Sequence, residues 1–370
     1  MNPAERAWRA VSDVAGVLPR AHSALTGSGD WNALSLDGAR QFGEVLLDEL
    51  ALTGLTLTAP PPRLERSVAS CAEIGAELAP NLAEAHSEPE PLRVRSVQRR
   101  RFAGHSYEQV TFDHDPQLPE ALSREGFGGP ATAVVHLCRD DDTRRPWLVW
   151  VHGAGQGRPI DLLFSRARRI QDRLGFNIAL PVQPGCGVRQ TRWPRYPSMD
   201  PVENVAGMMR AVSEVRAVVR WLRPQADAIV VSGVSMGSPV AGLVSHLEPV
   251  DAVAVYTPIA GLNAMIAAHL GRWGPSVRDT IALLQSGAAA DIMSVVDYHS
   301  VSPTAAPDRR LIVGAWYDQM ARRETALALH ERWGGRIHWH RGSHVGHLFA
   351  PGVQNASEDF LRSTIPAGAR

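Results

Sequence analysis

The stretch AIVVSGVSMGSPVAGLV, from Ala228 to Val244, decides the fold of this chain. Its first residues favour a buried strand, and the small and apolar residues after Ser235 favour a helix. A strand that turns so abruptly into a helix forces its turning residue into a strained conformation, and residues two positions away must be small. Gly233 and Gly237 occupy those two positions. The pattern predicts either a serine presented for chemistry or a structural turn whose serine caps the next helix.

Strand-like and helix-like segments alternate on both sides of this turn. Segments rich in strand-forming residues are 93–102, 106–114, 131–140, 146–153, 176–182, 228–233, 252–258, 309–318 and 336–342. The first two resemble an edge hairpin, and from 146 onward most strands are separated by helical patterns. Alternation of this kind predicts an α/β class protein, with a mostly parallel central sheet and helices on both faces.

Two segments lie outside this alternation. Residues 1–92 read as a helical N-terminal extension, which leaves 93–370 as the main domain, and about 261–305 reads as a helical, cap-like insertion. The extension would cover an active site or serve self-association as a homo-oligomer, and the sequence leaves both open. The apolar residues of the insertion would either line a pocket or pack it onto the sheet; they are Leu262, Met265, Ile266, Leu270 and Trp273.

Composition excludes several classes of function. The 370 residues carry 38 basic and 38 acidic side chains, so no basic excess suggests nucleic-acid binding. Every basic residue is arginine, which excludes a Schiff-base lysine and a P-loop. Three widely spaced cysteines indicate neither a disulfide framework nor a zinc site. The sequence has no signal-peptide pattern and no apolar run of membrane-spanning length, so we expect a cytoplasmic protein without a membrane span.

A serine hydroxyl becomes a good nucleophile when a base takes its proton, and that base is usually a histidine oriented by a carboxylate. Asp318 closes the predicted strand at 309–318, and His344 follows the last predicted strand. The order Ser235, Asp318, His344 and the segment Gly342-Ser343-His344-Val345-Gly346 resemble the α/β-hydrolase family over residues 95 to 365. The resemblance implies a nucleophile, an acid and a base in that order. His347 is the alternative base, and Asp318 has an alternative role as a helix cap.

The turn His152-Gly153-Ala154-Gly155-Gln156-Gly157 follows a predicted buried strand and resembles the family's H-G-x-G turn. The resemblance implies an oxyanion hole formed by the N–H groups of Ala154 and Met236, with Gly155 as the alternative donor to Ala154. A dinucleotide site is disfavoured, because the glycines are not spaced G-x-G-x-x-G and no acidic residue follows about 20 positions later. We expect His152 to brace the turn rather than to bind zinc.

Together these features predict a serine hydrolase that cleaves a carboxylic ester, a thioester or a small amide, without a cofactor or metal. The expected partner is a small-molecule acyl ester. Acyl transfer or a cofactor-free oxidative reaction with the same triad, and a non-catalytic binding protein with this fold, remain alternatives. Arginines at 189, 192 and 195 would either receive an acidic substrate group or form a solvated surface.

Overall fold

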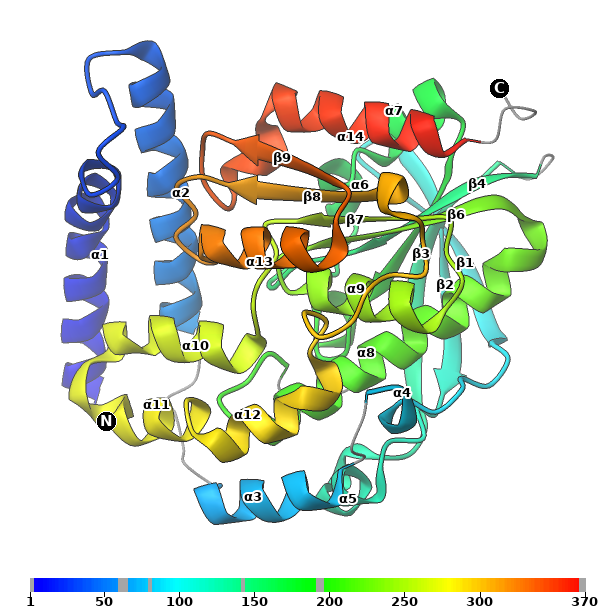
Figure 1. Cartoon of the computed structure of the whole chain (residues 1–370), viewed down its shortest axis with the longest axis horizontal. Coiled ribbons are helices and arrows are strands. Elements are labelled where there is room, and N and C mark those ends of the chain that lie inside the picture. Colours follow the sequence, from blue (N-terminus) through cyan, green and yellow to red (C-terminus); the bar gives the residue numbers. More distant parts are fainter. Residues whose placement is uncertain (1–2, 59–65, 79–81, 141–143, 191–195, 366–370) are drawn as a thin grey trace.

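The computed structural model describes residues 3–58, 66–78, 82–140, 144–190 and 196–365 (Figure 1). Within them, nine strands form one sheet in the order β1-β2-β3-β5-β4-β6-β7-β8-β9. The strands are β1 (Arg93–Phe102), β2 (His105–His114), β3 (Ala131–Cys138), β4 (Arg145–Val151), β5 (Asn177–Val182), β6 (Ala226–Val234), β7 (Ala252–Tyr256), β8 (Arg310–Ala315) and β9 (Arg336–His340).

Strands β4 to β9 pair in parallel, whereas β1, β2 and β3 pair antiparallel and β3 joins β5 antiparallel. The central strands β4, β5, β6 and β7 are buried along almost their whole length, because helices cover both faces. The predicted mostly parallel α/β sheet with an edge hairpin at β1 and β2 is therefore confirmed.

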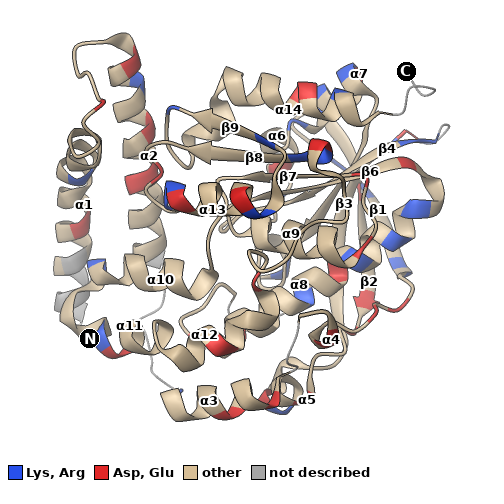
Figure 2. Ribbon diagram, in the orientation of Figure 1, with Lys and Arg blue, Asp and Glu red and all other residues tan. Residues whose placement is uncertain are grey.

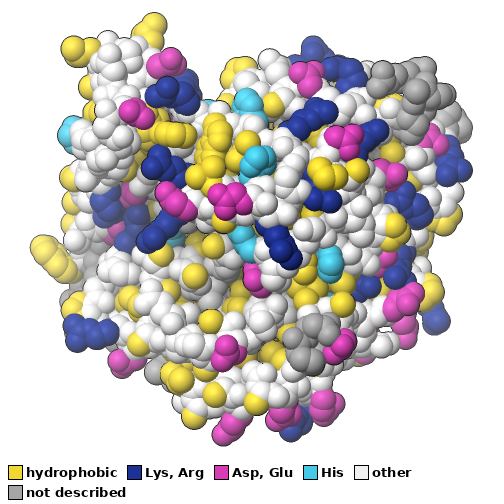
Figure 3. All heavy atoms as spheres, in the orientation of Figure 1, with side chains coloured by type: hydrophobic (Ala, Val, Ile, Leu, Met, Phe, Trp, Pro, Cys, Tyr) yellow, Lys and Arg dark blue, Asp and Glu magenta, His cyan; other side chains and the backbone are white. Residues whose placement is uncertain are grey.

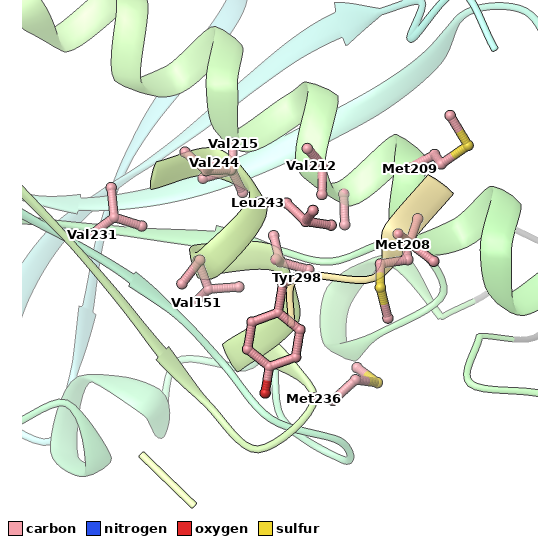
Figure 4. Packing of buried hydrophobic residues seen from close by; sticks show 14 of the residues in the cluster. Val151, Met208, Met209, Val212, Val215, Val231, Met236, Leu243, Val244 and Tyr298 are labelled. Atoms are coloured by element: carbon pink, nitrogen blue, oxygen red, sulfur yellow. The ribbon is translucent and has the colours of Figure 1, made fainter. Parts of the chain in front are cut away.

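Two groups of helices sandwich this sheet (Figure 1). On one face lie α6 (Asp161–Phe164), α7 (Ala167–Leu174) and α14 (Pro351–Thr364). On the other lie α8 (Pro201–Leu222), α9 (Gly237–Leu247) and α13 (Arg323–Trp333). Helix α8 is buried almost throughout, because the sheet lies on one side of it and further helices on the other. Figure 4 shows its side chains Val212 and Val215 packed with Leu243 and Val244 of α9.

The N-terminal region contributes α1 (Pro3–Thr26), α2 (Leu36–Thr58), α3 (Val68–Glu77) and α4 (Leu82–Ala85). Helices α1 and α2 form a hairpin beside the end of the sheet (Figure 1), and α3 packs against the insertion. Cys71 of α3 is fully buried, whereas Val68 is 50% exposed. Val68 is the first residue of the helix, and Ile74, one turn beyond Cys71, takes the buried position instead.

The insertion folds into α10 (Leu262–Leu270), η4 (Gly271–Val277), α11 (Arg278–Leu284), α12 (Gly287–Met293) and η5 (Ser294–Val296). Leu262, Leu270 and Trp273 are buried in its packing against the rest of the chain, and Met265 and Ile266 stay partly exposed. Among the described helices, none is long and apolar enough to cross a membrane.

Candidate active site

Ser235 lies at the turn between β6 and α9, at the carboxyl edge of the sheet. Its φ is +53°, which is a strained backbone value for a residue with a side chain. The N–H of Ser235 donates to the carbonyl of Tyr256 at 2.9 Å, which fastens the turn to the end of β7. The side chain itself is only partly buried. The turn thus holds a strained serine at the edge where ligands bind in open α/β sheets.

The two glycines around Ser235 are required by close backbone contacts. A Cβ on Gly233 would lie 2.2 Å from the carbonyl oxygen of Gly237, and a Cβ on Gly237 would lie 2.3 Å from the carbonyl oxygen of Val151. Real Cβ atoms do not approach backbone that closely, so larger residues would displace the turn. The small residues read from the sequence therefore allow the elbow to form against β4.

The turn after β4 reaches the serine directly. A Cβ on Gly153 would lie 3.3 Å from the Cβ of Ser235 and from the carbonyl oxygen of Val234, so the turn lies close against the serine. Ala154 follows in this turn, Gly155 is exposed with φ +76°, and Met236 is fully buried in the core (Figure 4). The predicted donors therefore lie in the two turns that meet at the serine.

His152 braces this turn, as the sequence suggested. Its Nε2 accepts a hydrogen bond from the N–H of Gln183 at 3.0 Å, so its Nδ1 carries the proton that bonds to the carbonyl of Gly153 at 2.8 Å. The side-chain amide of Gln183 also donates to the carbonyl of His152 at 2.6 Å. Burial lowers the pKa of His152 to about 4, so the ring stays neutral and keeps both bonds.

Asp318 and His344 come together at the ends of β8 and β9. Nδ1 of His344 lies 2.8 Å from Oδ2 of Asp318. The other carboxylate oxygen accepts hydrogen bonds from the N–H groups of Met320 at 2.8 Å and Ala321 at 2.7 Å, so the carboxylate is held in one orientation. This pairing places the proton of the neutral ring on Nδ1 and leaves Nε2 as a proton acceptor. Within the described residues, Nε2 of His344 has no hydrogen-bond partner.

The surroundings of His344 favour its protonated form. Burial lowers the pKa of the imidazole, but the charge of Asp318, its hydrogen bond and the charge of Asp48 together outweigh burial. The net pKa therefore lies above its usual value of 6.5. Two carboxylates would stabilise an imidazolium formed when this ring takes a proton.

His347 has a different environment. Its Nδ1 bonds to the carbonyl of His344, and its ring stacks on Tyr256 with centroids 6.0 Å apart. Burial lowers the pKa of His347 to about 4, and no hydrogen bond joins it to a carboxylate in the part of the chain that the structure describes. The structure therefore gives the carboxylate partner to His344.

Ser235 Oγ forms no hydrogen bond with His344 or His347 in the described part of the chain. Ser235 follows β6, whereas Asp318 and His344 follow β8 and β9, so β7 lies between them in the sheet. Hydrogen bonds of this kind are often long or poorly aligned in proteins without substrate and tighten when it binds. The structure brings Asp318 and His344 together and places Ser235 at the same edge of the sheet.

Comparisons with known proteins support the architecture. No protein-family model matches the chain. Uncharacterised proteins from two strains of Mycobacterium tuberculosis are each 30% identical over 274 residues, so the match covers 70% of this chain and 65% of each relative's length.

Solved structures match over most of the chain. An acetyl xylan esterase from a Paenibacillus species has a TM-score of 0.50 at 17% identity, covering 82% of this chain and 96% of that one. Acetyl xylan esterase 1 from a Thermoanaerobacterium species also has a TM-score of 0.50, at 12% identity, covering 84% and 96% respectively. This chain has the α/β-hydrolase fold. At such low identity the likeness extends to the fold and not to a substrate.

Helix α2 contacts the loop that carries His344, and its residues lie outside the α/β-hydrolase motifs. Asp48 is fully buried, and its carboxylate accepts hydrogen bonds from the backbone of His344 and Val345 at 2.9 and 2.8 Å. Glu44, one turn earlier, bonds to Nε2 of His340 at 2.7 Å and to the N–H of Ser343 at 3.1 Å. Figure 2 marks acidic residues in red along the ribbon of α2. Sequence reasoning missed both residues, although Glu44 and Asp48 lie within the mostly apolar run EVLLDELAL, residues 44–52, which was a signal.

Contacts on two sides hold the helical insertion at about 261–305 in place. Nε2 of His269 in α10 lies 3.3 Å from the carbonyl oxygen of Met320, which follows the Asp318 turn. Arg272 forms ion pairs with Glu49 of α2, the closest at 2.8 Å. These contacts join the insertion to the acid turn and to the N-terminal hairpin.

The suggested arginine site is not supported at Arg189. That guanidinium is 1% exposed and pairs with both carboxylate oxygens of Glu214 at 2.6 and 2.9 Å, because β5 and α8 enclose it. Arg192 and Arg195 lie outside the described residues. Elsewhere on the viewed face, arginine and acidic side chains are interspersed (Figures 2 and 3), in line with the net charge of +0.

Proposed function

We propose that this chain is a serine hydrolase that cleaves carboxylic esters, with Ser235, His344 and Asp318 as its catalytic triad. One observation supports the proposal above the others: a buried His344–Asp318 pair lies at the same sheet edge as a strained serine between two obligatory glycines. Residues 93–370 would form the catalytic domain, with a cap at about 261–305 and an extension at 1–92.

In the first half-reaction, Oγ of Ser235 attacks the ester carbonyl carbon while Nε2 of His344 takes the hydroxyl proton. The negative charge that develops on the carbonyl oxygen is stabilised by the N–H groups of Ala154 and Met236, with Gly155 as the alternative first donor. When the tetrahedral intermediate collapses, the ester C–O bond breaks and His344 gives its proton to the leaving alkoxide. The products are a free alcohol and an acyl ester on Ser235.

The second half-reaction repeats these steps with water. Nε2 of His344 takes a proton from water, and the resulting hydroxide attacks the acyl carbonyl. Collapse of the intermediate returns the proton to Oγ of Ser235 and releases a carboxylic acid. Asp318 holds the imidazole in the correct tautomer in both halves and stabilises its charged form.

Labelling with a fluorophosphonate probe tests this proposal, because the probe reacts covalently with an activated serine hydroxyl. We expect wild-type protein to be labelled, mass spectrometry to locate the adduct on Ser235, and Ser235→Ala to prevent labelling. Ser238, three residues later and fully buried, provides the matched control: Ser238→Ala should still be labelled on Ser235. Folded wild-type protein that is never labelled on Ser235 would contradict the proposal and favour a non-catalytic binding protein.

A panel of p-nitrophenyl esters with acyl chains of increasing length then measures hydrolysis itself. Release of p-nitrophenol with an initial burst would indicate an acyl-enzyme that accumulates. Acyl transfer is distinguished by adding an alcohol acceptor and measuring whether the new ester replaces the free acid among the products.

A further inference from the structure

The last catalytic loop is held from outside the α/β-hydrolase core. His344 lies in the loop after β9, and helix α2 of the N-terminal hairpin packs along that loop. Asp48 of α2 is 0% exposed and lies 296 positions from His344 in the sequence. A buried carboxylate is costly unless its oxygens are paired, so its partners indicate its purpose.

Both oxygens of Asp48 face hydrogen-bond donors from the catalytic loops. Oδ2 accepts from the N–H of His344 at 2.9 Å and from the N–H of Gln319 at 3.2 Å. Oδ1 accepts from the N–H of Val345 at 2.8 Å and lies 2.8 Å from Oγ of Ser343. Gln319 directly follows Asp318, so a single oxygen atom bridges the backbone of the acid turn and the backbone of the base itself.

Glu44 makes a second contact with the same loop, and its side chain lies against two of the loop's glycines. A Cβ on Gly342 would lie 1.8 Å from Oε2 of Glu44, and a Cβ on Gly346 would lie 2.2 Å from it. The hydroxyl of Ser343 also lies 2.8 Å from the backbone carbonyl of Glu44. The small residues around His344 therefore fit the loop against α2.

We infer that Asp48 is a positioning residue for the His344–Asp318 pair, fixing the separation of the two loops and the direction in which Nε2 points. The inference rests on the proposed function, because it assigns Asp48 a role through the catalytic base. Through the side chain of Asp48 the N-terminal hairpin then positions catalytic groups, although it supplies no group that touches substrate. The negative charge of Asp48 acts in the same direction, because it favours the imidazolium form of His344.

The informative variant is Asp48→Asn, which preserves shape and removes one acceptor. Whichever way the amide is turned, its NH₂ group faces backbone N–H donors, either Val345 or the pair His344 and Gln319. The matched control is Glu49→Gln, since Glu49 is the next residue on α2 and equally buried. Its carboxylate pairs with Arg20 and Arg272, and within the described residues it forms no hydrogen bond or ion pair with the catalytic loops.

We expect Asp48→Asn to lower kcat on a p-nitrophenyl ester by about 100-fold, since small misplacements of catalytic groups have effects of that size. KM should stay within about 3-fold, because substrate contacts are unchanged. The rate of Ser235 labelling should fall in step with kcat, and the downfield proton NMR signal of His344 Nδ1–H should shift or disappear. Glu49→Gln should lower the melting temperature while retaining kcat within about 3-fold and the NMR signal.

The inference is overturned if Asp48→Asn keeps kcat within about 3-fold of wild type, or if Glu49→Gln loses as much activity at an equal melting temperature. If Asp48→Asn does not fold, Ser343→Ala decides instead. It removes only the hydroxyl between Asp48 and Glu44, and an unchanged kcat there would count against the inference, whereas a selective loss of kcat would support it. Wild-type protein that is never labelled on Ser235 would contradict the proposed function. That outcome differs from a failure of the inference on Asp48, in which wild-type protein is labelled and Asp48→Asn is as active as wild type.

Discussion

Nδ1 of His344 lies 2.8 Å from Oδ2 of Asp318, and the two side chains are 6% and 2% exposed. The pair is thus shielded from water, and the only ring nitrogen left to exchange a proton with substrate or serine is Nε2. His347, three residues later, has the same type of ring and nearly the same burial but no carboxylate partner. The two histidines differ in their hydrogen bonds, and that difference can be tested.

Replacing each histidine by alanine should give unequal losses. We expect His344→Ala to lower kcat by at least about 10⁴-fold, because the proton acceptor and the partner of Asp318 are both lost. His347→Ala should cost no more than about 10-fold, through loosened packing against Tyr256. Initial rates on a p-nitrophenyl ester measure both. A larger loss in His347→Ala than in His344→Ala would assign the base to His347.

Asp318→Asn should separate orientation from charge. The amide of asparagine is neutral and has only one oxygen. If that oxygen accepts from the N–H groups of Met320 and Ala321, the NH₂ group faces Nδ1 of His344 and cannot accept its proton. We expect kcat at neutral pH to fall on the order of 10³- to 10⁴-fold, with little change in KM. Circular dichroism of the variant checks that the fold is retained. Near-normal kcat would leave Asp318 only the role of a helix cap.

The pH dependence of kcat/KM should follow the charge of His344. General-base catalysis needs the neutral ring, so activity is low below the pKa of the folded protein and rises as pH increases through it. Because Asp318 and Asp48 outweigh burial and raise that pKa, the midpoint should lie above 6.5. His347 also faces this group, but burial keeps it neutral in this range. Rates measured from about pH 5 to 9 give the midpoint. A value below 6.5 would show that burial outweighs the two carboxylates in setting the pKa of His344.

The sequence predicted those parts of the fold that depend on residues close together in the chain, such as the turn around Ser235. The strand, the glycines and the helix around Ser235 are neighbours in sequence, and the strain at φ +53° follows from that turn alone. The order of Asp318 and His344 along the chain was equally readable, because both follow strands of the parallel sheet. Their 2.8 Å hydrogen bond was an expectation of the family resemblance and not of the pattern itself.

Long-range contacts could not be predicted, because a local sequence pattern does not specify its distant partner. Asp48 meets His344 across 296 positions, and nothing in either segment specifies the other. Arg189 was predicted either to receive an acidic substrate group or to lie on a solvated surface, whereas Glu214 pairs with it inside the protein. Helix α12 lies within the predicted helical insertion, but its short, alanine-rich sequence has no distinct apolar stripe, and α3 and α8 supply the packing that stabilises it.

The turn that contains Gly153 is proposed to carry an oxyanion donor, so a substitution there should affect catalysis more than stability. A Cβ on Gly153 would lie 3.3 Å from Cβ of Ser235, from Oε1 of Gln156 and from the carbonyl of Val234, which is tight but not impossible. Gly153→Ala should therefore shift the turn by a few tenths of an ångström and lower kcat by about 10-fold or more, since oxyanion donors act only at correct distances. The melting temperature should change little. Unchanged kcat would place the oxyanion donors elsewhere.

The carboxylate of Asp161 fastens the other end of that turn, and its ionisation should make stability depend on pH. Its Oδ2 accepts from the N–H of Gly157 at 2.7 Å, and burial raises its pKa from 3.8 to about 6. A raised pKa means that the folded protein binds this proton more tightly than the unfolded chain. The stability from this shift is complete below pH 3.8 and is lost as pH rises through about 6.

Asp161→Asn retains an acceptor for Gly157 and removes the ionisation. The variant should gain stability relative to wild type between pH 5 and pH 8, by roughly 1 kcal/mol for a shift of this size. Urea unfolding of both proteins at the two pH values measures this gain, and other buried carboxylates such as Asp48 cancel because both proteins contain them. A difference in unfolding free energy that is equal at both pH values would show that Asp161 titrates normally, and the turn would then be held by a fully charged carboxylate.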